Sequence, residues 1–376
     1  MNRYFYYNVL LLGLINLALF VPHTLIQYRY TGALMSMACA AVSGTVLAIL
    51  FTHVMKTFPG KGIPEILSLY IPKYASIPFL LVWALTWLSA SSLSLNTFSV
   101  LINRFFNPDT SSMIVLIVMC LTCMYGATRS LLTIIFVLEI GLIFSAPIIL
   151  FVFFKAIHNK NMEWDAIRTV IQYWKQMPRI KPFAAASFAF TGYINFFMMN
   201  RLLSPNFRLR FRWLIPVICS LALLISFFVP IGIHGTEESA NYLYIWSVTS
   251  DTLIMTYGFI ERVIFVFLLM YLVMTLIFAS IGWLMAMEMV KSCLPKAKPD
   301  IDPSRTPRSN WIIVSFFAAM TVAYANWISE KENFEITTYW IVIRSGVEIF
   351  SVLFLFVLSL FAPKAGKPKA GKKLEQ

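Results

Sequence analysis

Long apolar runs, separated by short charged or Pro- and Gly-rich stretches, dominate the pattern of this chain. A helix needs about 20 apolar residues to cross the roughly 30 Å hydrocarbon core of a bilayer. The pattern therefore predicts ten transmembrane helices, at about 5–28, 31–56, 77–105, 113–130, 131–156, 183–200, 212–233, 252–290, 311–328 and 336–361.

The composition agrees with this pattern. Of the 376 residues, 59% are hydrophobic and only 12% are charged, whereas a soluble domain carries about 25% charged residues. We therefore expect an all-α integral membrane protein with a single transmembrane domain over 1–361. The last residues, 362–376, are basic and rich in Gly and Pro, which predicts a disordered tail.

The net charge of +13 would suggest a nucleic-acid partner in a soluble protein. Here most Lys and Arg residues lie in loops and in the tail, on one side of the predicted spans. The lipid bilayer explains this charge better, so we expect no nucleic-acid partner and both termini on the inner side. The Cys and His residues form no catalytic or metal-binding pattern, so we expect no metal, no cofactor and no enzyme activity.

Two of the predicted spans are interrupted. In the first span, Pro22 follows Gly13 and Asn16, and proline removes a backbone donor and clashes with the preceding turn. The sixth span begins with Pro182 and contains Gly192. Freed backbone groups in a membrane are tolerated only where protein buries them or where they line a cavity. Each interruption therefore predicts either a packing kink or part of a ligand site.

The interruptions open the two halves of the chain, which have five predicted spans each. The halves cover about 5–156 and 183–361. Because five is odd, the second half would cross the membrane in the opposite direction to the first. Paired interrupted segments of this kind are typical of transporters that are built from inverted repeats and hold their ligand at the midplane.

Several charged residues fall within the predicted spans, where charge is costly and commonly functional. Arg344 and Glu348 are four residues apart, so one helix face can pair them, and we expect this pair to be structural more than ligand-binding. Glu261 and Arg262 point about 100° apart on a helix, so at least one should reach another helix or a cavity. Glu139 has no local partner and could pair with Arg262 or Arg344, or titrate.

Polar side chains mark two further stretches. On the third span, Ser92 and Asn96 share one helix face, which predicts either contacts between helices or the wall of a cavity. On the sixth span, Thr191, Tyr193 and Asn195 surround Gly192. This composition favours exposed backbone near a ligand.

Three stretches together resemble a known family. They are FPGKGIPEIL at 58–67, GLINLALFVPH in the first span, and YGFIERVIFVFLLMYLV with the Glu261-Arg262 pair. The chain resembles the B subunit of the spore nutrient germinant receptors, the spore germination permease family of the amino acid–polyamine–organocation superfamily. The resemblance implies a LeuT-like fold of ten helices in two inverted five-helix repeats, with the first and sixth helices broken.

The resemblance also implies a function. Such a subunit binds a small nutrient germinant, often an amino acid, and acts with an A-type membrane subunit and a C-type lipoprotein subunit in the spore inner membrane. Members often carry a glutamate after a Gly-aromatic pair in the sixth helix, whereas here Gly192-Tyr193 is followed by Ile194 and Asn195. This difference leaves the class of germinant open.

The sequence therefore predicts a sensor that binds a nutrient in a midplane pocket. The alternatives are an ion-coupled amino acid transporter that works without partner subunits, with Glu139 or Glu261 as its proton site, and a scaffold that binds nothing. The expected ligand-binding residues are Gly13, Asn16, Phe20, Val21, Pro22, Ser92, Asn96, Thr191, Gly192, Tyr193, Asn195, Tyr257 and Glu261. The expected buried ionic residues are Glu139, Arg262, Arg344 and Glu348.

Overall fold

The structure, a computed structural model, describes residues 2–202, 209–254, 261–294 and 306–361. The predicted tail and Tyr257 lie outside these ranges. Every named element within them is helical, in agreement with the predicted all-α class. The longer helices are α1 (Asn2–Ala18), α3 (Ala33–Thr57), α5 (Lys73–Phe105), α6 (Ser112–Ala127), α7 (Leu131–Ile157), α11 (Leu214–His234), α13 (Val263–Cys293), α14 (Arg308–Trp327) and α15 (Glu330–Leu360).

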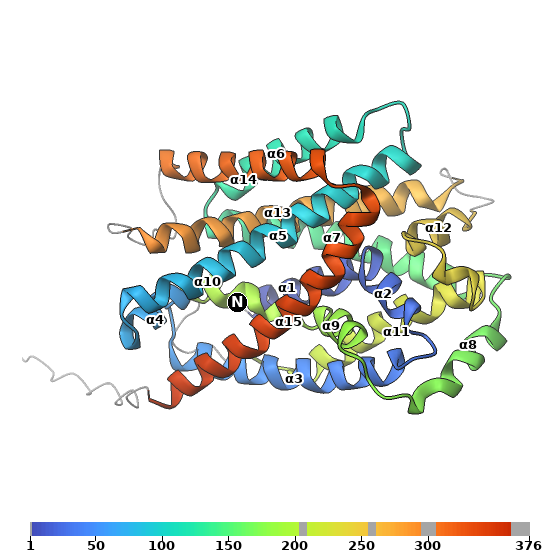
Figure 1. Cartoon of the computed structure of the whole chain (residues 1–376), viewed down its shortest axis with the longest axis horizontal. Helices are drawn as coiled ribbons and strands as arrows, with labels where there is room; N and C mark the ends of the chain where they lie inside the picture. The colour runs from blue at the N-terminus through green and yellow to red at the C-terminus, as the bar shows by residue number, and fades with distance from the viewer. Residues whose placement is uncertain (1, 203–208, 255–260, 295–305, 362–376) are drawn as a thin grey trace, which may run out of the picture.

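Shorter helices interrupt or connect the long ones. They are α2 (Val21–Gln27), α4 (Ile63–Tyr70), α8 (Trp164–Ile171), α9 (Ile180–Phe188), α10 (Phe196–Met199), α12 (Ile245–Asp251) and the 3-10 helices η1 (Gln172–Lys175), η2 (Thr191–Asn195), η3 (Asn200–Leu202) and η4 (Glu238–Ala240). Figure 1 shows α4 and α10 at one end of the bundle and α8 and α12 at the other.

Within the described residues, six helices are long and apolar enough to cross a membrane: α3, α5, α7, α11, α13 and α15. The bent pair formed by α1 and α2 would be a seventh span, and α6 is a shorter apolar helix. The chain is thus a multi-pass membrane protein. Helical segments lie at all ten predicted ranges, but the ten-span topology itself stays a prediction.

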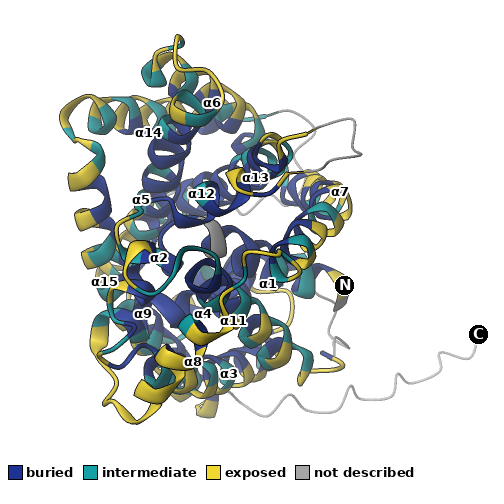
Figure 2. Ribbon diagram, turned by 90° about the vertical axis from the view of Figure 1, so that its right-hand side faces the viewer, coloured by how far each residue is buried: buried dark blue, intermediate teal, exposed yellow. Residues whose placement is uncertain are grey.

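The distribution of burial fits a bundle surrounded by lipid. Figure 2 shows buried residues around the centre of the bundle and exposed ones along its outer helices. Large apolar side chains such as Ile117, Phe144 and Ile343 are exposed on α6, α7 and α15. Such surfaces suit hydrocarbon rather than water.

The predicted break in the first span is confirmed. The helix axes before and after it, over Arg3–Asn16 and Val21–Gln27, differ by 53°. The bend falls at residues 19–20, just before Pro22, which lies in the first turn of α2. Proline is tolerated there because the first amide groups of a helix have no intrahelical acceptor.

The sixth segment is also interrupted, as predicted. It consists of α9, then the 3-10 helix η2, then the single turn α10 and η3. The fully helical part ends at Phe188, and the 3-10 part begins at Thr191, directly before Gly192. Segments of 3-10 helix in the middle of a longer helix commonly mark a functional hinge or local strain.

Side-chain caps set where two of the long helices begin. Ser130 accepts a hydrogen bond from the Thr133 amide and starts α7 directly after α6. Ser329 and Glu332 form a capping box at the start of α15. Each side chain satisfies a backbone amide that the helix leaves free, which fixes the first turn and hence which residues of α15 face inward.

The predicted boundary of the eighth span is wrong at its start. The helix α13 begins at Val263, with Arg262 as its N-cap, and not near residue 252. The part of the predicted span before Val263 follows the short helix α12 directly and does not belong to α13. Hydropathy does not distinguish an apolar stretch that precedes a helix from the helix itself.

Candidate functional site

A narrow pocket lies in the centre of the bundle, between both interrupted segments and the middle of α5, α13 and α15. The space between its lining atoms, with open solvent included, is about 320 Å³, and the centre of a water-sized sphere can reach about 20 Å³ of it. This is room for about one water molecule, so a nutrient would bind only after lining side chains move. The lining residues are Leu12, Trp83, Thr86, Trp87, Ala90, Phe188, Thr191, Ile194, Phe278, Trp340 and Arg344.

Arg344, one of the lining residues, belongs to a buried ion pair. The Arg344 Nη1 atom lies 2.7 Å from the Glu348 Oε2 atom, and the two side chains are 4% and 3% exposed. The Tyr193 hydroxyl donates to the other oxygen of Glu348 at 2.5 Å, and Arg344 Nη2 donates to the Ser187 hydroxyl at 3.3 Å. The charges are therefore balanced by partners from α15, α9 and η2. Burial without such partners would be strongly unfavourable.

One donor of Arg344 stays free. Its Nε atom is buried and has no hydrogen-bond partner among the described residues. The guanidinium also lies over the ring of Phe188, with its Cζ atom 4.4 Å from the ring centroid. A pocket that combines indole rings with one unpaired buried donor can accept an amphipathic ligand that carries an acceptor oxygen.

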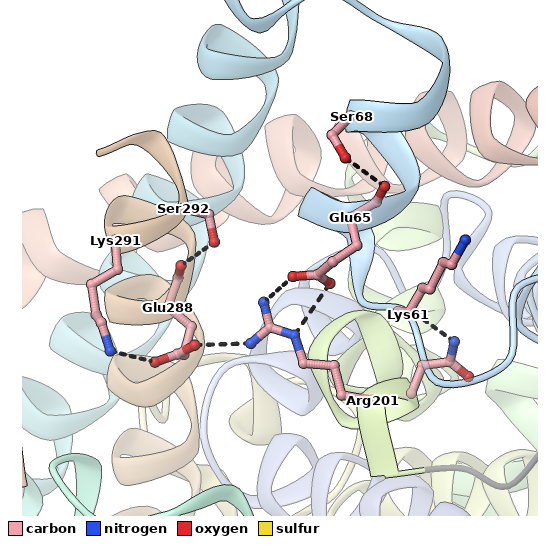
Figure 3. A network of polar contacts seen from close by, with 8 residues as sticks. Lys61, Glu65, Ser68, Arg201, Glu288, Lys291 and Ser292 are labelled. Carbon is pink, nitrogen blue, oxygen red and sulfur yellow. Dashed lines mark hydrogen bonds and ion pairs between the residues drawn. The ribbon is translucent and has the colours of Figure 1, made fainter. Parts of the chain in front are cut away.

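A second ionic cluster closes the end of the bundle near α4. Arg201 on η3 contacts Glu65 on α4 at 2.6 Å and Glu288 on α13 at 2.8 Å, and Lys291 contacts Glu288 at 3.0 Å. Figure 3 shows the Arg201 guanidinium between the two carboxylates. The Asn200 amide donates to the backbone carbonyls of Phe58 and Lys61, so η3 is fixed to the connection between α3 and α4 as well.

Comparison with known protein families gives one match. The family described as spore germination protein matches residues 16–335, which include the sixth-segment break, α5, α13 and most of the pocket lining. The chain belongs to this family. The resemblance noted in the sequence is thereby confirmed, and the family is one of membrane permeases or receptors and not of enzymes. A comparison with curated proteins finds no match.

In this spore germination family member, only Thr191 of the predicted sixth-segment residues lines the pocket. Gly192 instead lies against backbone, because a Cβ atom there would collide with Asn8 and Val9. The Asn195 amide donates to the Asn8 side chain at 2.6 Å. Gly192 and the Asn195 amide therefore hold η2 against α1, which is a packing role.

None of the predicted residues of the first span lines the pocket. These residues are Gly13, Asn16, Phe20, Val21 and Pro22. Gly13 approaches the sixth-segment break, since a Cβ atom there would lie 3.8 Å from the Ala189 carbonyl oxygen. The Asn16 amide donates to the Leu12 carbonyl one turn earlier, at 2.7 Å. The first span contributes Leu12 to the pocket instead.

The predicted polar face of the third span serves both purposes that the sequence left open. The Ser92 and Thr321 hydroxyls lie 2.7 Å apart and join α5 to α14. Asn96 lines a separate polar cavity toward the α12 end of the bundle. Neither residue lines the central pocket.

Two of the predicted buried ionic residues, Glu139 and Arg262, and the predicted ligand-binding residue Glu261 need correction. Glu139 pairs with Arg3 at 3.3 Å, and not with Arg262 or Arg344. Glu261 and Arg262 are exposed and precede α13, because the helix begins later than predicted. The Arg344–Glu348 pair is confirmed.

The sequence interpretation missed the three tryptophans of the pocket and the Arg201 cluster. Trp83 and Trp340 fall near the starts of the predicted spans 77–105 and 336–361. Trp87 falls further inside its span, away from the interfacial belt where tryptophan is most common. That position was a usable signal. Glu65 and Arg201 gave none, because their partners lie far away in the sequence.

Proposed function

We propose that this chain is the ligand-sensing subunit of a spore nutrient receptor and that it binds a small germinant, such as an amino acid, in the central pocket. The observation that carries this proposal is the meeting of both interrupted segments at one pocket, through Leu12 and Thr191, opposite the buried cation of Arg344. Membership of the spore germination protein family supports it.

The fold proposed with this function is ten transmembrane helices in two inverted repeats of five. The packing of the helices supports this fold. Moving both helices of a contacting pair by five proposed spans gives another pair of helices that are also in contact. Helix α1 packs against α11 as α9 packs against α3, and α7 packs against α13 as α15 packs against α5. The short helices α4 and α12 follow the second and the seventh proposed span, respectively. Inverted repeats predict such pairing.

The pocket would bind an amphipathic ligand by two kinds of contact. The free Nε donor of Arg344 would meet a carboxylate oxygen, and the indole rings of Trp83, Trp87 and Trp340 would enclose the rest of the ligand. Because the pocket is narrow, binding would favour a state in which its lining has moved. Such differential affinity is what allows a ligand to shift a two-state equilibrium.

We propose an A-type membrane subunit and a C-type lipoprotein as partners, and the spore inner membrane as the location, with both termini on the inner side. These proposals rest on the family and on the distribution of Lys and Arg. The transporter alternative has less support, because its two expected proton sites do not fit. Glu139 is paired with Arg3, and Glu261 is exposed.

A cavity-filling variant tests the pocket. Ala90→Leu on α5 would place a larger side chain in the lining, whereas Ala84→Leu would overpack the same helix away from it. The full chain, purified in lipid nanodiscs, is titrated with each common amino acid while tryptophan fluorescence is recorded. Spores that carry each variant, together with the partner subunits, are tested for germination with the same compounds.

We expect the wild type and Ala84→Leu to give a saturable fluorescence change with the amino acid that triggers germination. Ala90→Leu should lose both the fluorescence change and the germination response while it still folds. If Ala90→Leu binds and responds as Ala84→Leu does, the central pocket is not the germinant site.

A further inference from the structure

A broad groove on the surface of the bundle lies between α4, the first half of α5 and the second half of α15. The centre of a water-sized sphere can reach about 760 Å³ of it, compared with about 20 Å³ in the central pocket. Of its lining residues, Val82 is 45% exposed and Phe350 is 62% exposed, so the groove opens to the surroundings of the bundle. Both α5 and α15 are long and apolar enough to cross a membrane. The groove therefore faces lipid.

The polar groups of the lining are already used within the chain. The Trp83 Nε1 atom donates to the Ser351 hydroxyl at 2.9 Å, and the Ser76 hydroxyl donates to the Lys73 carbonyl at 3.1 Å. The other lining side chains are apolar. An empty space beside such side chains forfeits dispersion contacts, and a hydrocarbon restores them without any hydrogen bond. The groove is therefore suited to a hydrocarbon.

The shape of the groove fits a flexible chain better than a second helix. A helix is about 10 Å wide with its side chains, and helices in membranes approach closely where small residues recur at every fourth position. Gly346 is small, but Val342 and Phe350 stand one helical turn before and after it. The rings of Phe79 and Phe354 also meet across the groove, with their centroids 5.7 Å apart. These bulky side chains keep a helix out and leave room for an acyl chain.

A free positive charge lies at one end of the groove. Ile71 and Ala75 both line the groove at the start of α5, and the exposed Lys73 lies between them in the chain. Lys73 forms no ion pair with any described residue, and the carboxylate of Glu65 on the adjoining α4 is paired with Arg201. A lysine side chain can lie along apolar surface and extend its ammonium group to the headgroup layer. There it attracts anionic lipid.

We propose that this groove binds an anionic phospholipid, with one acyl chain between α5 and α15 and the phosphate paired with Lys73. Trp83 separates this site from the central pocket, since it lines both. The acyl chain would therefore support the indole that the central pocket uses on its other side. The lipid site does not depend on the function proposed above, because its test needs no germinant.

Two substitutions test the two parts of the site. Gly346→Leu fills the groove without disturbing the fold, because a Cβ atom there meets nothing within 4 Å and leucine favours a helix more than glycine does. Val118→Phe is its control, since it adds the same number of carbon atoms at a 57% exposed position on α6. Lys73→Gln removes the charge. Lys56→Gln, at an exposed lysine in the last turn of α3, is the matched control.

The purified full chain in a mild detergent is titrated with dioleoyl phosphatidylglycerol and, separately, with dioleoyl phosphatidylcholine. Native mass spectrometry counts the lipids bound to each chain. We expect one phosphatidylglycerol to bind more tightly than all others to the wild type and to both controls. Gly346→Leu should lose this tight site. Lys73→Gln should weaken the binding of phosphatidylglycerol about fivefold and leave that of phosphatidylcholine unchanged.

The proposal is overturned if the wild type binds the two lipids equally, or if Gly346→Leu binds phosphatidylglycerol as Val118→Phe does. Equal affinities of Lys73→Gln and Lys56→Gln would also overturn it, and this comparison remains decisive should Gly346→Leu fail to fold. If the wild type is instead a dimer that Gly346→Leu converts to a monomer, the groove is an interface between two copies of the chain and not a lipid site.

Discussion

The hydrogen bond from Tyr193 to Glu348 allows a sharp test of how the interrupted sixth segment is held. Tyr193 and Tyr271 are both fully buried and use their hydroxyls in different ways. Tyr193 donates to the Glu348 carboxylate at 2.5 Å, whereas Tyr271 donates to the Leu14 backbone carbonyl at 3.0 Å. Tyr193→Phe and Tyr271→Phe therefore remove the same hydroxyl group. Tyr193→Phe takes it from a charged acceptor and Tyr271→Phe from a neutral one.

The expected costs differ for that reason. A hydrogen bond to a charged group contributes about 1.5–3 kcal/mol. Neutral hydrogen bonds inside a membrane protein contribute about 0.6 kcal/mol on average, because the unfolded chain in the membrane also finds partners. Tyr193→Phe also leaves one oxygen of the buried Glu348 without a donor. We expect its loss of stability to exceed that of Tyr271→Phe by about 1–2 kcal/mol.

The measurement is unfolding of the purified chain in mixed micelles, with increasing SDS and tryptophan fluorescence as the signal. A double-mutant cycle of Tyr193→Phe with Glu348→Gln gives the interaction energy between these two side chains. This energy should be favourable, and it should exceed about 1 kcal/mol only if the two side chains act together. Equal losses for Tyr193→Phe and Tyr271→Phe would refute the reasoning, since they would show that the carboxylate does not depend on this donor.

Two further predictions concern the ends of the bundle. Arg201→Met leaves two carboxylates without their shared cation and should lower the free energy of unfolding by about 3–5 kcal/mol. Arg168→Met, at an exposed ion pair, should lower it by less than about 1 kcal/mol in the same assay. Similar losses for the two variants would contradict the burial of Arg201. The Tyr30 hydroxyl and the Arg29 guanidinium hold the pKa of Glu237 below its ordinary value. The stabilisation from these contacts is present above that ordinary value and is lost as the pH falls through the lowered pKa. The protection factors of the amides around residue 237, which correct for the intrinsic pH dependence of hydrogen exchange, should fall over that range in the wild type and stay constant in Glu237→Gln. A fall of equal size in both proteins would contradict the assignment.

Local features of the fold could be predicted from the sequence. Hydropathy located the helical segments because a helix that crosses lipid needs apolar residues in each successive turn. The break before Pro22 and the Arg344–Glu348 pair were equally accessible, since each depends on residues within a single helix. The start of α13 could not be predicted from the sequence, because Glu261 and Arg262 follow an apolar stretch that hydropathy does not separate from the helix.

The candidate site was harder to predict because its members meet only in the folded chain. A small residue such as Gly192 can expose backbone to a ligand or admit a neighbouring helix, and the sequence does not distinguish these. Here Asn8 and Val9 fill the space. Arg201 is an extreme case, because its partners Glu65 and Glu288 come from opposite halves of the chain.

The stretch 187–202 connects the pocket to both ion-pair systems. Ser187 and Tyr193 hold the Arg344–Glu348 pair, Thr191 lines the pocket, and Arg201 joins α4 to α13. Because this stretch is made of short helical pieces, it can change its backbone at the junctions more easily than a continuous helix can. A ligand that moved Thr191 would therefore act directly on the segment that carries Arg201. Under the function proposed above, we expect the effect of a ligand to reach the end of the bundle that carries α4 by this path.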